Sequence, residues 1–470
     1  MMKIKNLFIY AFLAFTFVFT ACNDKDDETT TTDDVWTKNS VSANKAKIED
    51  EGIAMLDEMK AMENEEAMET NAAFVGFLGQ DDPFGDIGDF KSVNLRKDNV
   101  LRVNMALADF NGSKVKNVFE ALSLKSVEAD SNTVQFFYDE LVGVYTWTPY
   151  GNGGHWDYVE TGDEIKFLFP STEDGETNDA SYTVKFVAYD GPYLDPMFED
   201  NLPSEVSAEL AIGTTVHMGY YLDLTYNSDG YPTKIETNLM VGDFNMAVMA
   251  ENANNTAFDV SYSFTHGSTI LLKMELGADG DWTEGNIEDH ITFYKEEYNN
   301  ETWEWVEVEV DMYDEWDYAE GEVWKVVTDG NTSFQAMNIK VTGQIDAEEL
   351  GDYMDNNDFD EQSEAEVQAA ADKINEYAAL TLRFADTDEI VAMGEAYPKY
   401  KEGYYNYNDV WVEYAEEDKY YDIDMRFVFA DGSKIDLETY FETGFNDLED
   451  QIEAYIKELE ETYGFGSDED

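Results

Sequence analysis

The feature that most constrains the fold is a long series of short alternating segments between Gly143 and about Val341, separated by turns rich in glycine and asparagine. In each segment apolar and polar residues alternate, so each set of side chains faces one side of a strand. Short turns can join antiparallel strands, whereas parallel strands need long crossover connections. The pattern therefore predicts an antiparallel meander, or a partly open barrel or sandwich.

The clearest predicted strands come in pairs around turn residues, as expected for β-hairpins. These pairs are 145–148 with 156–159, 214–226 with 233–240, 260–264 with 270–276 and 291–294 with 303–312, and single strands are expected at 165–169 and 182–187. Strands return between residues 380 and 437, most clearly at 410–414 and 420–429. The sheet is therefore expected to be interrupted once, by residues 345–379.

Helical periodicity indicates three further elements. Residues 42–72 form the first predicted helix, with Ser42 as its N-cap and methionines at helical spacing. The second begins at Ser363, and the third begins at Asn446 with an apolar stripe on one face. The fold class predicted from these patterns is α+β and β-dominated, with an N-terminal helix, a helical insertion and a C-terminal amphipathic helix.

The first residues have the pattern of a secretory signal peptide. Lys3 and Lys5 precede an apolar run from Leu7 to Phe19, and small residues follow before Cys22, the only cysteine. The apolar run is shorter than the ~20 residues that span a bilayer. The alternative is a buried apolar helix with a chance cysteine at its end, but the position and both flanks favour the signal peptide.

Phe19-Thr20-Ala21-Cys22 resembles a lipobox, the cleavage and acylation site of bacterial lipoproteins. The resemblance implies cleavage before Cys22 and attachment of acyl chains to this residue, which then hold the protein on a membrane. Lys25, Asp26, Asp27 and Glu28 follow, and resemble the surface-export signal of Bacteroidota lipoproteins. They imply an outer-membrane lipoprotein that faces the cell surface; the alternative is an anchor that faces the periplasm.

These patterns divide the chain into seven expected segments. They are a signal peptide (1–21), the lipidated cysteine with a flexible acidic tether (22–41), a helical and mixed region (42–142), an antiparallel β region (143–344), an acidic loop and helix (345–379), a second β region (380–445), and a C-terminal helix and tail (446–470).

The net charge excludes one class of partner. The 470 residues contain 103 acidic and 29 basic side chains, a formal net charge of −74. Nucleic-acid binding depends on basic residues that contact phosphates, and a strongly negative surface repels polyanions. We therefore expect no nucleic-acid partner, and we expect the acyl chains to supply the membrane attachment; protein partners are not indicated.

Two acidic clusters have the oxygen ligands that Ca²⁺ prefers. The first comprises Asp279, Asp281, Thr283, Glu284 and Glu288, and the second comprises Asp352, Asp355, Asn357, Asp358 and Asp360. The first is only loosely similar to an EF-hand loop, because Glu284 occupies the position where that loop needs glycine. In so acidic a chain, such clusters also arise as solvated loops, so calcium is a possible cofactor rather than an established one.

Aromatic side chains concentrate in two stretches and are candidate ligand-binding residues. They include Trp303, Trp305, Trp316 and Trp324 in the first stretch and Tyr404, Tyr405 and Trp411 in the second. Exposed rings can stack on sugars, whereas alternation with acidic residues favours packing across strands. Both interpretations stay open at this point.

No catalytic motif emerges, so the sequence predicts a non-catalytic envelope lipoprotein that binds a glycan or an apolar molecule. This expectation is similar, by analogy of architecture, to half-barrel lipoprotein carriers. One alternative is an anchored hydrolase, although the sequence contains neither a G-x-S-x-G elbow nor a phosphate-binding loop. The other is a structural or adhesive surface protein stabilised by calcium.

Overall fold

The computed structural model describes most of the chain from Val35 onward. The described residues are 35–81, 83, 138, 141–150, 153–191, 203–228, 232–253, 255–299, 304–310, 318–357, 363–405, 411–413, 419–443, 445, 447–448, 451–452, 454–455 and 457. Cys22 and the export signal Lys25–Glu28 lie outside them.

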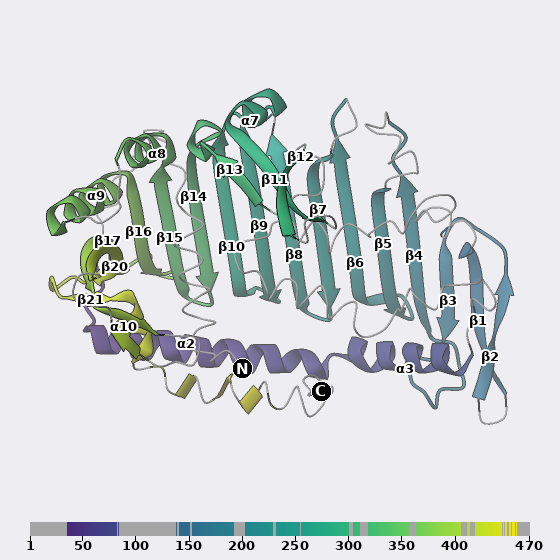
Figure 1. Ribbon diagram of the computed structural model, residues 1–470. Helices are drawn as coiled ribbons and strands as arrows, with labels where there is room; N and C mark the ends of the chain where they lie inside the picture. Colours follow the sequence, from purple (N-terminus) through teal and green to yellow (C-terminus); the bar gives the residue numbers. More distant parts are fainter. Residues whose placement is uncertain are drawn as a thin grey trace. The chain divides into compact units, whose positions relative to one another are not determined.

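The main element is an open 16-stranded sheet (Figure 1). Its strands, in hydrogen-bonded order, are β2 (Gly153–Val159), β1 (Gly143–Tyr150), β3 (Ile165–Phe169), β4 (Ala180–Ala188), β5 (Pro203–Ile212), β6 (Thr215–Tyr226), β7 (Pro232–Val241), β8 (Phe244–Ala253), β9 (Ala257–His266), β10 (Thr269–Gly280), β14 (Val327–Ala336), β15 (Ile339–Asp346), β16 (Ala378–Phe384), β17 (Ile390–Lys401), β20 (Tyr420–Val428) and β21 (Lys434–Asp436). From β3 to β8 each strand pairs antiparallel with the next, while β1 and β3 pair in parallel. The expected β-dominated α+β fold with an antiparallel meander is confirmed.

The chain forms two compact units, which we describe separately. The meander unit comprises residues 55–251 and 261–272, and the insertion unit comprises the described residues of 1–54, 252–260 and 273–470. The helices are α2 (Val41–Ala61), α3 (Glu66–Gln80), α7 (Glu284–His290), α8 (Ala347–Asp355), α9 (Glu364–Tyr377) and α10 (Leu437–Glu442), with 3₁₀ turns η1 (Met62–Asn64) and η4 (Val323–Lys325).

The predicted first helix is longer than expected and is broken once. Helix α2 begins at Val41 because Ser40, rather than the predicted Ser42, is the N-cap: its Oγ accepts a hydrogen bond from Ala43 N at 3.3 Å. The helix gives way to η1, and Glu65 then has an extended backbone with ψ of 133°. Helix α3 follows, so the apolar segment around Phe74, expected to be separate, forms its buried face.

The core of the meander unit lies where α3 packs on β1 to β4. Alternation places Ile165, Phe167 and Phe169 of β3 in this core, each at most 7% exposed. Phe74 of α3 packs edge-on against Phe167 at 5.3 Å and stacks on Tyr182 at 5.1 Å between ring centroids. Figure 1 shows α3 at one end of these strands. The amphipathic sheet is therefore covered by a helix at that end.

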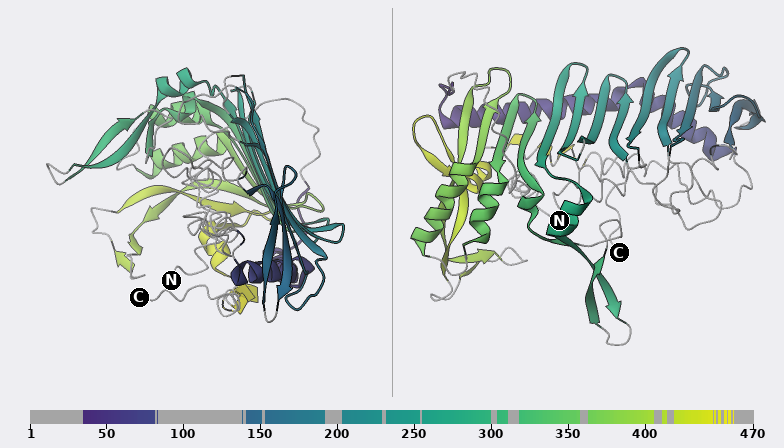
Figure 2. Two further views of the ribbon diagram at one scale, coloured as in Figure 1. Left: turned by 90° about the vertical axis from the view of Figure 1, so that its right-hand side faces the viewer. Right: turned by 90° about the horizontal axis from the view of Figure 1, so that it is seen from above.

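The insertion unit has its own core, built by β15 to β17, β20 and α10. Phe384, Phe427 and Tyr440 are 0% exposed at its centre. Helix α9 begins with the capping box that Ser363 and Glu366 form, which confirms the start predicted at Ser363. Two smaller sheets belong to this unit: β12 (Glu304–Val310), β11 (Ile291–Asn299) and β13 (Tyr318–Gly321); and β18 (Gly403–Tyr405) with β19 (Trp411–Glu413). The β11–β12 hairpin projects away from β14 and β15 (Figure 2).

Two side chains one helical turn apart on α2 hold the C-terminal segments in this unit. Lys45 Nζ donates to the backbone carbonyls of Tyr440 and Thr443 at 2.6 and 2.8 Å, at the end of α10. Glu49 Oε1 accepts from the backbone N–H groups of Asp447 and Leu448 at 2.9 and 3.3 Å. A cation at a helix end and a carboxylate at a helix start are the favourable arrangements for the helix dipole. The described residues between 447 and 457 are helical, as predicted for this region.

Candidate functional site

Strand register in the meander unit brings apolar side chains from five strands into three rows. Residues directly opposite in an antiparallel pair point to the same side of a sheet. The rows are Phe186, Val206, Leu222, Thr237 and Val248; Val184, Ala208, Tyr220, Leu239 and Met246; and Tyr182, Leu210, Met218, Val241 and Phe244. We call these fifteen positions the apolar face; none of them carries a charge.

The other side of the same strands is mostly polar. Its rows run through Glu205, Asp223, Glu236 and Met249; Ser207, Tyr221, Asn238 and Ala247; and Glu209, Gly219, Met240 and Asn245. Tyr221 OH donates to Glu209 Oε1 at 2.9 Å across the strands. The side chains of Glu205, Asp223 and Glu236 are exposed. An antiparallel sheet with one polar and one apolar side normally buries the apolar side.

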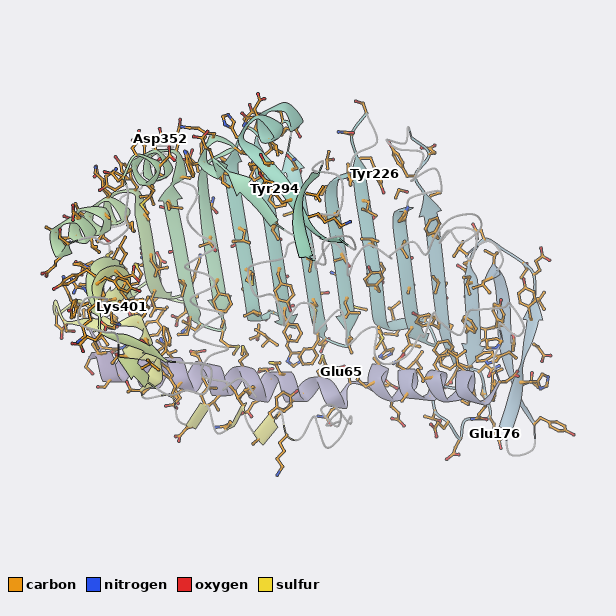
Figure 3. All side chains as sticks on the ribbon, in the orientation of Figure 1. Glu65, Glu176, Tyr226, Tyr294, Asp352 and Lys401 are labelled. Atoms are coloured by element: carbon orange, nitrogen blue, oxygen red, sulfur yellow. The ribbon has the colours of Figure 1, made fainter. Side chains whose placement is uncertain are left out.

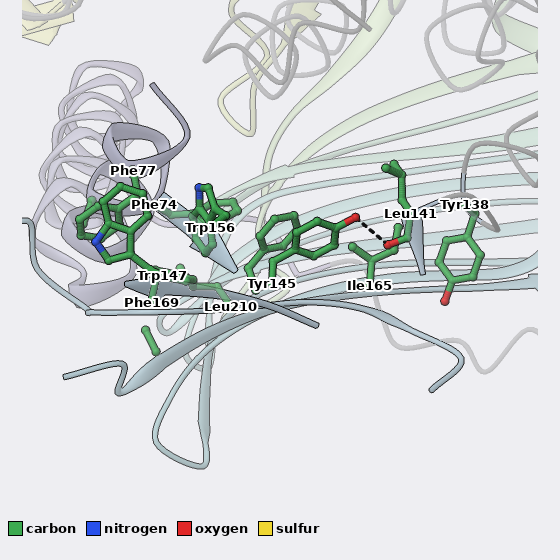
Figure 4. Close-up of a cluster of buried hydrophobic side chains, with 13 residues drawn as sticks. Phe74, Phe77, Tyr138, Leu141, Tyr145, Trp147, Trp156, Ile165, Phe169 and Leu210 are labelled. Carbon is green, nitrogen blue, oxygen red and sulfur yellow. Dashed lines mark hydrogen bonds between the residues drawn. The ribbon is translucent and has the colours of Figure 1, made fainter. Parts of the chain in front are cut away.

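Helix α3 covers only the third row of the apolar face. Leu210 in that row is 0% exposed, and it belongs with Phe74 and Phe77 to the core shown in Figure 4. The side chains of Ala208, Tyr220, Leu222, Leu239, Met246 and Val248, in the other two rows, are half-buried. Apolar surface that is not fully buried is the part of a protein that gains most from covering, at ~25 cal/mol per Å².

The tyrosines of this region show that its interior is withdrawn from water. Burial raises the pKa of Tyr182, and it raises the pKa of Tyr262 in β9 to about 12. Burial and the neighbouring Tyr158 raise the pKa of Tyr145 to about 12, and its hydroxyl donates to Leu141 O at 3.1 Å, the dashed line in Figure 4. Tyr138 OH donates to Asp163 O at 2.7 Å at the edge of the same core.

A second candidate surface is a network of charged side chains in the insertion unit, on β17, β20 and β21. We call it the charged ladder: Glu395, Tyr397, Lys399, Lys401, Asp424, Arg426, Lys434 and Asp436. Lys399 and Lys401 each lie 3.0 Å from Asp424, and Figure 3 marks Lys401. Arg426 donates to Glu395 at 2.6 Å and lies over the Tyr397 ring. Every charge in the ladder is paired within the network, so the ladder needs no ligand to satisfy it.

The first predicted calcium cluster folds as a helix start. Asp281 Oδ1 accepts hydrogen bonds from Thr283 Oγ1 and Thr283 N at 2.7 and 3.1 Å, and these bonds lower the pKa of Asp281. Asp279 is in β10, while Glu284 and Glu288 are on α7. The carboxylate of Asp281 is thus already used in capping the turn before α7.

The second predicted calcium cluster lies at the end of α8. Asp352 forms an ion pair with Lys325, and Asp355 is the last residue of the helix. Asn357 Nδ2 donates to Tyr353 O at 2.6 Å, and Asp358 and Asp360 lie outside the described residues. Within the part of the chain that the structure describes, no three His, Cys, Asp or Glu side chains are grouped to hold a metal ion.

The predicted aromatic residues do not form one described surface. Trp305 lies in β12, Tyr404 and Tyr405 in β18 and Trp411 in β19, whereas Trp303 and Trp316 lie outside the described residues. Trp324 in η4 lies against Gly351 of α8, where an added Cβ would be 2.3 Å from its ring. The most exposed described tyrosines near β18 are Tyr400 and Tyr420, at 42% and 40%.

Sequence reasoning did not single out the residues of the apolar face. Two of its strands, β5 and β8, were not delimited from the sequence, because no distinct turn signal separates them from their neighbours. The signal that was present is the alternation itself, as in Val206, Ala208 and Leu210 of β5.

Comparison with known proteins adds no family assignment: no family model, curated protein or solved structure matches the chain. Among the described helices, none combines the length and the apolar character that a membrane crossing requires.

Proposed function

We propose that this protein is a non-catalytic lipoprotein of the bacterial outer membrane, which binds an apolar ligand with acyl chains on the apolar face. In this proposal acyl groups on Cys22 anchor the chain, and Lys25 to Glu28 direct it to the cell surface. Each buried CH₂ of an acyl anchor contributes ~0.8 kcal/mol, so the anchor holds the protein where lipids are abundant.

The observation that carries the proposal is the half-buried state of two uncharged rows on an otherwise strongly acidic protein. Leu222 and Leu239 lie in these rows, flanked by Tyr220 and Val248. Binding sites for apolar ligands are lined mainly by aliphatic and aromatic side chains, with few polar groups. Acyl chains match this surface because they bring apolar area without charge, and a net charge of −74 disfavours polyanions.

A binding measurement with a fluorescent fatty acid tests the proposal. We expect the protein from Asn23 onward to enhance the fluorescence of cis-parinaric acid, and phospholipid to compete. Leu222→Lys places a charge in the middle row region and should weaken binding at least tenfold, because a desolvated ammonium is costly. Asp223→Lys, one residue away on the polar side, is the matched control and should bind normally.

The proposal fails if the wild type does not bind the probe, or if both variants lose binding equally. Equal loss would indicate that the β6 strand is damaged rather than that a ligand surface is blocked. Near-ultraviolet circular dichroism of both variants separates these cases, since it reports aromatic packing.

A glycan is the second candidate ligand, and the exposed Tyr400 supports it. Its ring lies 5.0 Å from that of Tyr421, which gives two neighbouring aromatic side chains at one end of β17 and β20. Titration with oligosaccharides should then give binding that Tyr400→Ala abolishes and Leu222→Lys leaves unchanged. An anchored hydrolase and a calcium-stabilised adhesive protein stay as alternatives: the first predicts turnover in a substrate screen, and the second a lower melting temperature in EDTA.

The anchor and its orientation are tested in cells. Cys22→Ala should move the protein from the membrane to the soluble fraction. Proteinase added to intact cells should digest the wild type, and alanine at Lys25, Asp26 and Asp27 should protect it without loss of lipidation. Protection of the wild type until the outer membrane is broken would instead show a periplasmic orientation.

A further inference from the structure

Two of the four histidines contact the same helical layer in the meander unit. His266, at the end of β9, has Nδ1 at 2.5 Å from Glu58 Oε2 of α2. His217, at the start of β6, has Nδ1 at 3.7 Å from Glu66 Oε2 of α3. Both imidazoles are about one quarter exposed, at 27% and 22%. The helices therefore meet one edge of the sheet through two imidazole–carboxylate pairs.

The edge that carries these histidines is a hydrogen-bonded row of turns. Gly242 N donates to His217 O at 2.7 Å, and Gly267 N donates to Asp243 O at 2.8 Å. Gly242 has φ of +58° and no side chain, which leaves room for the carboxylate of Glu65. Glu65 is the extended residue at the break between the helices, as Figure 3 shows. The turns thus hold both histidines in place relative to one another.

His266 also borders the apolar face. Its ring stacks on Phe244 with centroids 4.1 Å apart and an angle of 4° between the planes, and Phe244 packs on Phe264 at 6.0 Å. A neutral imidazole suits an aromatic neighbour, whereas a protonated imidazole gains charge-assisted bonding to Glu58. The two protonation states of His266 therefore favour different surroundings.

We infer that His266, with a smaller contribution from His217, makes the attachment of the helices to the sheet edge depend on pH. Histidine changes charge between about pH 5 and pH 8, the range that envelope proteins meet. The other charged groups at this edge are Glu65, over Gly242, and Asp243 of the same turn. Both are acidic and stabilise protonated imidazoles. The attachment is tight when the histidines are charged and looser when they are neutral.

Hydrogen exchange on the full chain tests the inference, and it does not require a ligand. We expect residues 55–80 and the turn at Gly267 to exchange about fivefold more slowly at pH 5.5 than at pH 7.5, after correction for intrinsic rates. His266→Gln keeps a hydrogen-bond donor near Glu58 but carries no charge, so it should remove most of this difference. His217→Gln should remove a smaller part.

His155→Gln is the matched control, because His155 pairs with Asp157 at 3.4 Å on the edge strand β2 and touches no helix. It should keep the full pH difference. The inference is overturned if the wild type shows no slowing at pH 5.5, or if His266→Gln retains it. A global loss of protection in His266→Gln at both pH values would also overturn it, because the residue would then be needed for folding irrespective of its charge.

Discussion

The apolar face and the charged ladder are both half-exposed sheet surfaces, but they differ in what they leave unsatisfied. In the ladder, Asp424 is 25% exposed and lies 3.0 Å from each of two lysines. On the apolar face, Leu222 and Leu239 are also half-exposed, but nothing comparable satisfies them within the described strands. Paired charges tolerate water, whereas apolar surface gains free energy only by being covered. Equal exposure therefore has different meanings, and this difference is why we place the ligand on the apolar face.

The largest effect should come from removing the helix cover over one end of that face. Phe74→Ala deletes a ring that is 6% exposed and lies 4.8 Å from Phe169. Large-to-small changes in a core cost about 3–5 kcal/mol for phenylalanine. Urea unfolding followed by near-ultraviolet circular dichroism measures the loss. Leu222→Ala, on the half-buried part of the same face, should cost less than half as much; equal costs would show that the two parts are equally buried.

A smaller effect should follow from breaking the ladder. Burial acts to raise the pKa of Asp424, but hydrogen bonds from Lys399 and Lys401 outweigh it and hold this pKa below the ordinary carboxyl value. The stabilisation is therefore present above about pH 4 and is lost as the pH falls through the lower folded-state value. Asp424→Asn should cost about 1 kcal/mol at pH 7, reduced by solvent screening.

Unfolding measured from pH 7 to pH 2 checks this prediction. The difference between the wild type and Asp424→Asn should shrink below pH 4, and neither should change binding of the fatty-acid probe. A difference that stays constant with pH would mean that Asp424 acts through packing rather than charge.

The smallest effect should separate a turn under the helices from a turn in the open. Gly213 and Gly242 both have left-handed φ values, of +60° and +58°. A Cβ at Gly213 would meet nothing within 4 Å, whereas a Cβ at Gly242 would be 1.7 Å from Glu65 Oε2. Alanine at either position should cost about 1 kcal/mol in backbone strain, and Gly242→Ala should cost a few tenths more, because the flexible Glu65 side chain can move. Thermal unfolding of the two variants compares them directly.

The sequence by itself determined the type of fold and several boundaries, because these depend on local patterns. Alternation and turn residues located β3 at residues 165–169, and Ser363 with Glu366 marked the start of α9. The lipobox resemblance at Cys22 is likewise a local pattern, and it stays a prediction. The sequence could not set the N-cap at Ser40 rather than Ser42, since both serines suit that position.

The tertiary structure decided which alternating side chains remain half-exposed and which carboxylates are already used. Val206 and Phe167 have similar local patterns, yet only Phe167 lies under α3 and is 4% exposed. Asp281 and Asp352 were grouped by sequence as calcium ligands, yet one accepts hydrogen bonds from Thr283 and the other pairs with Lys325. Burial and pairing depend on residues distant in the chain, and short-range periodicity contains no information about which of them meet.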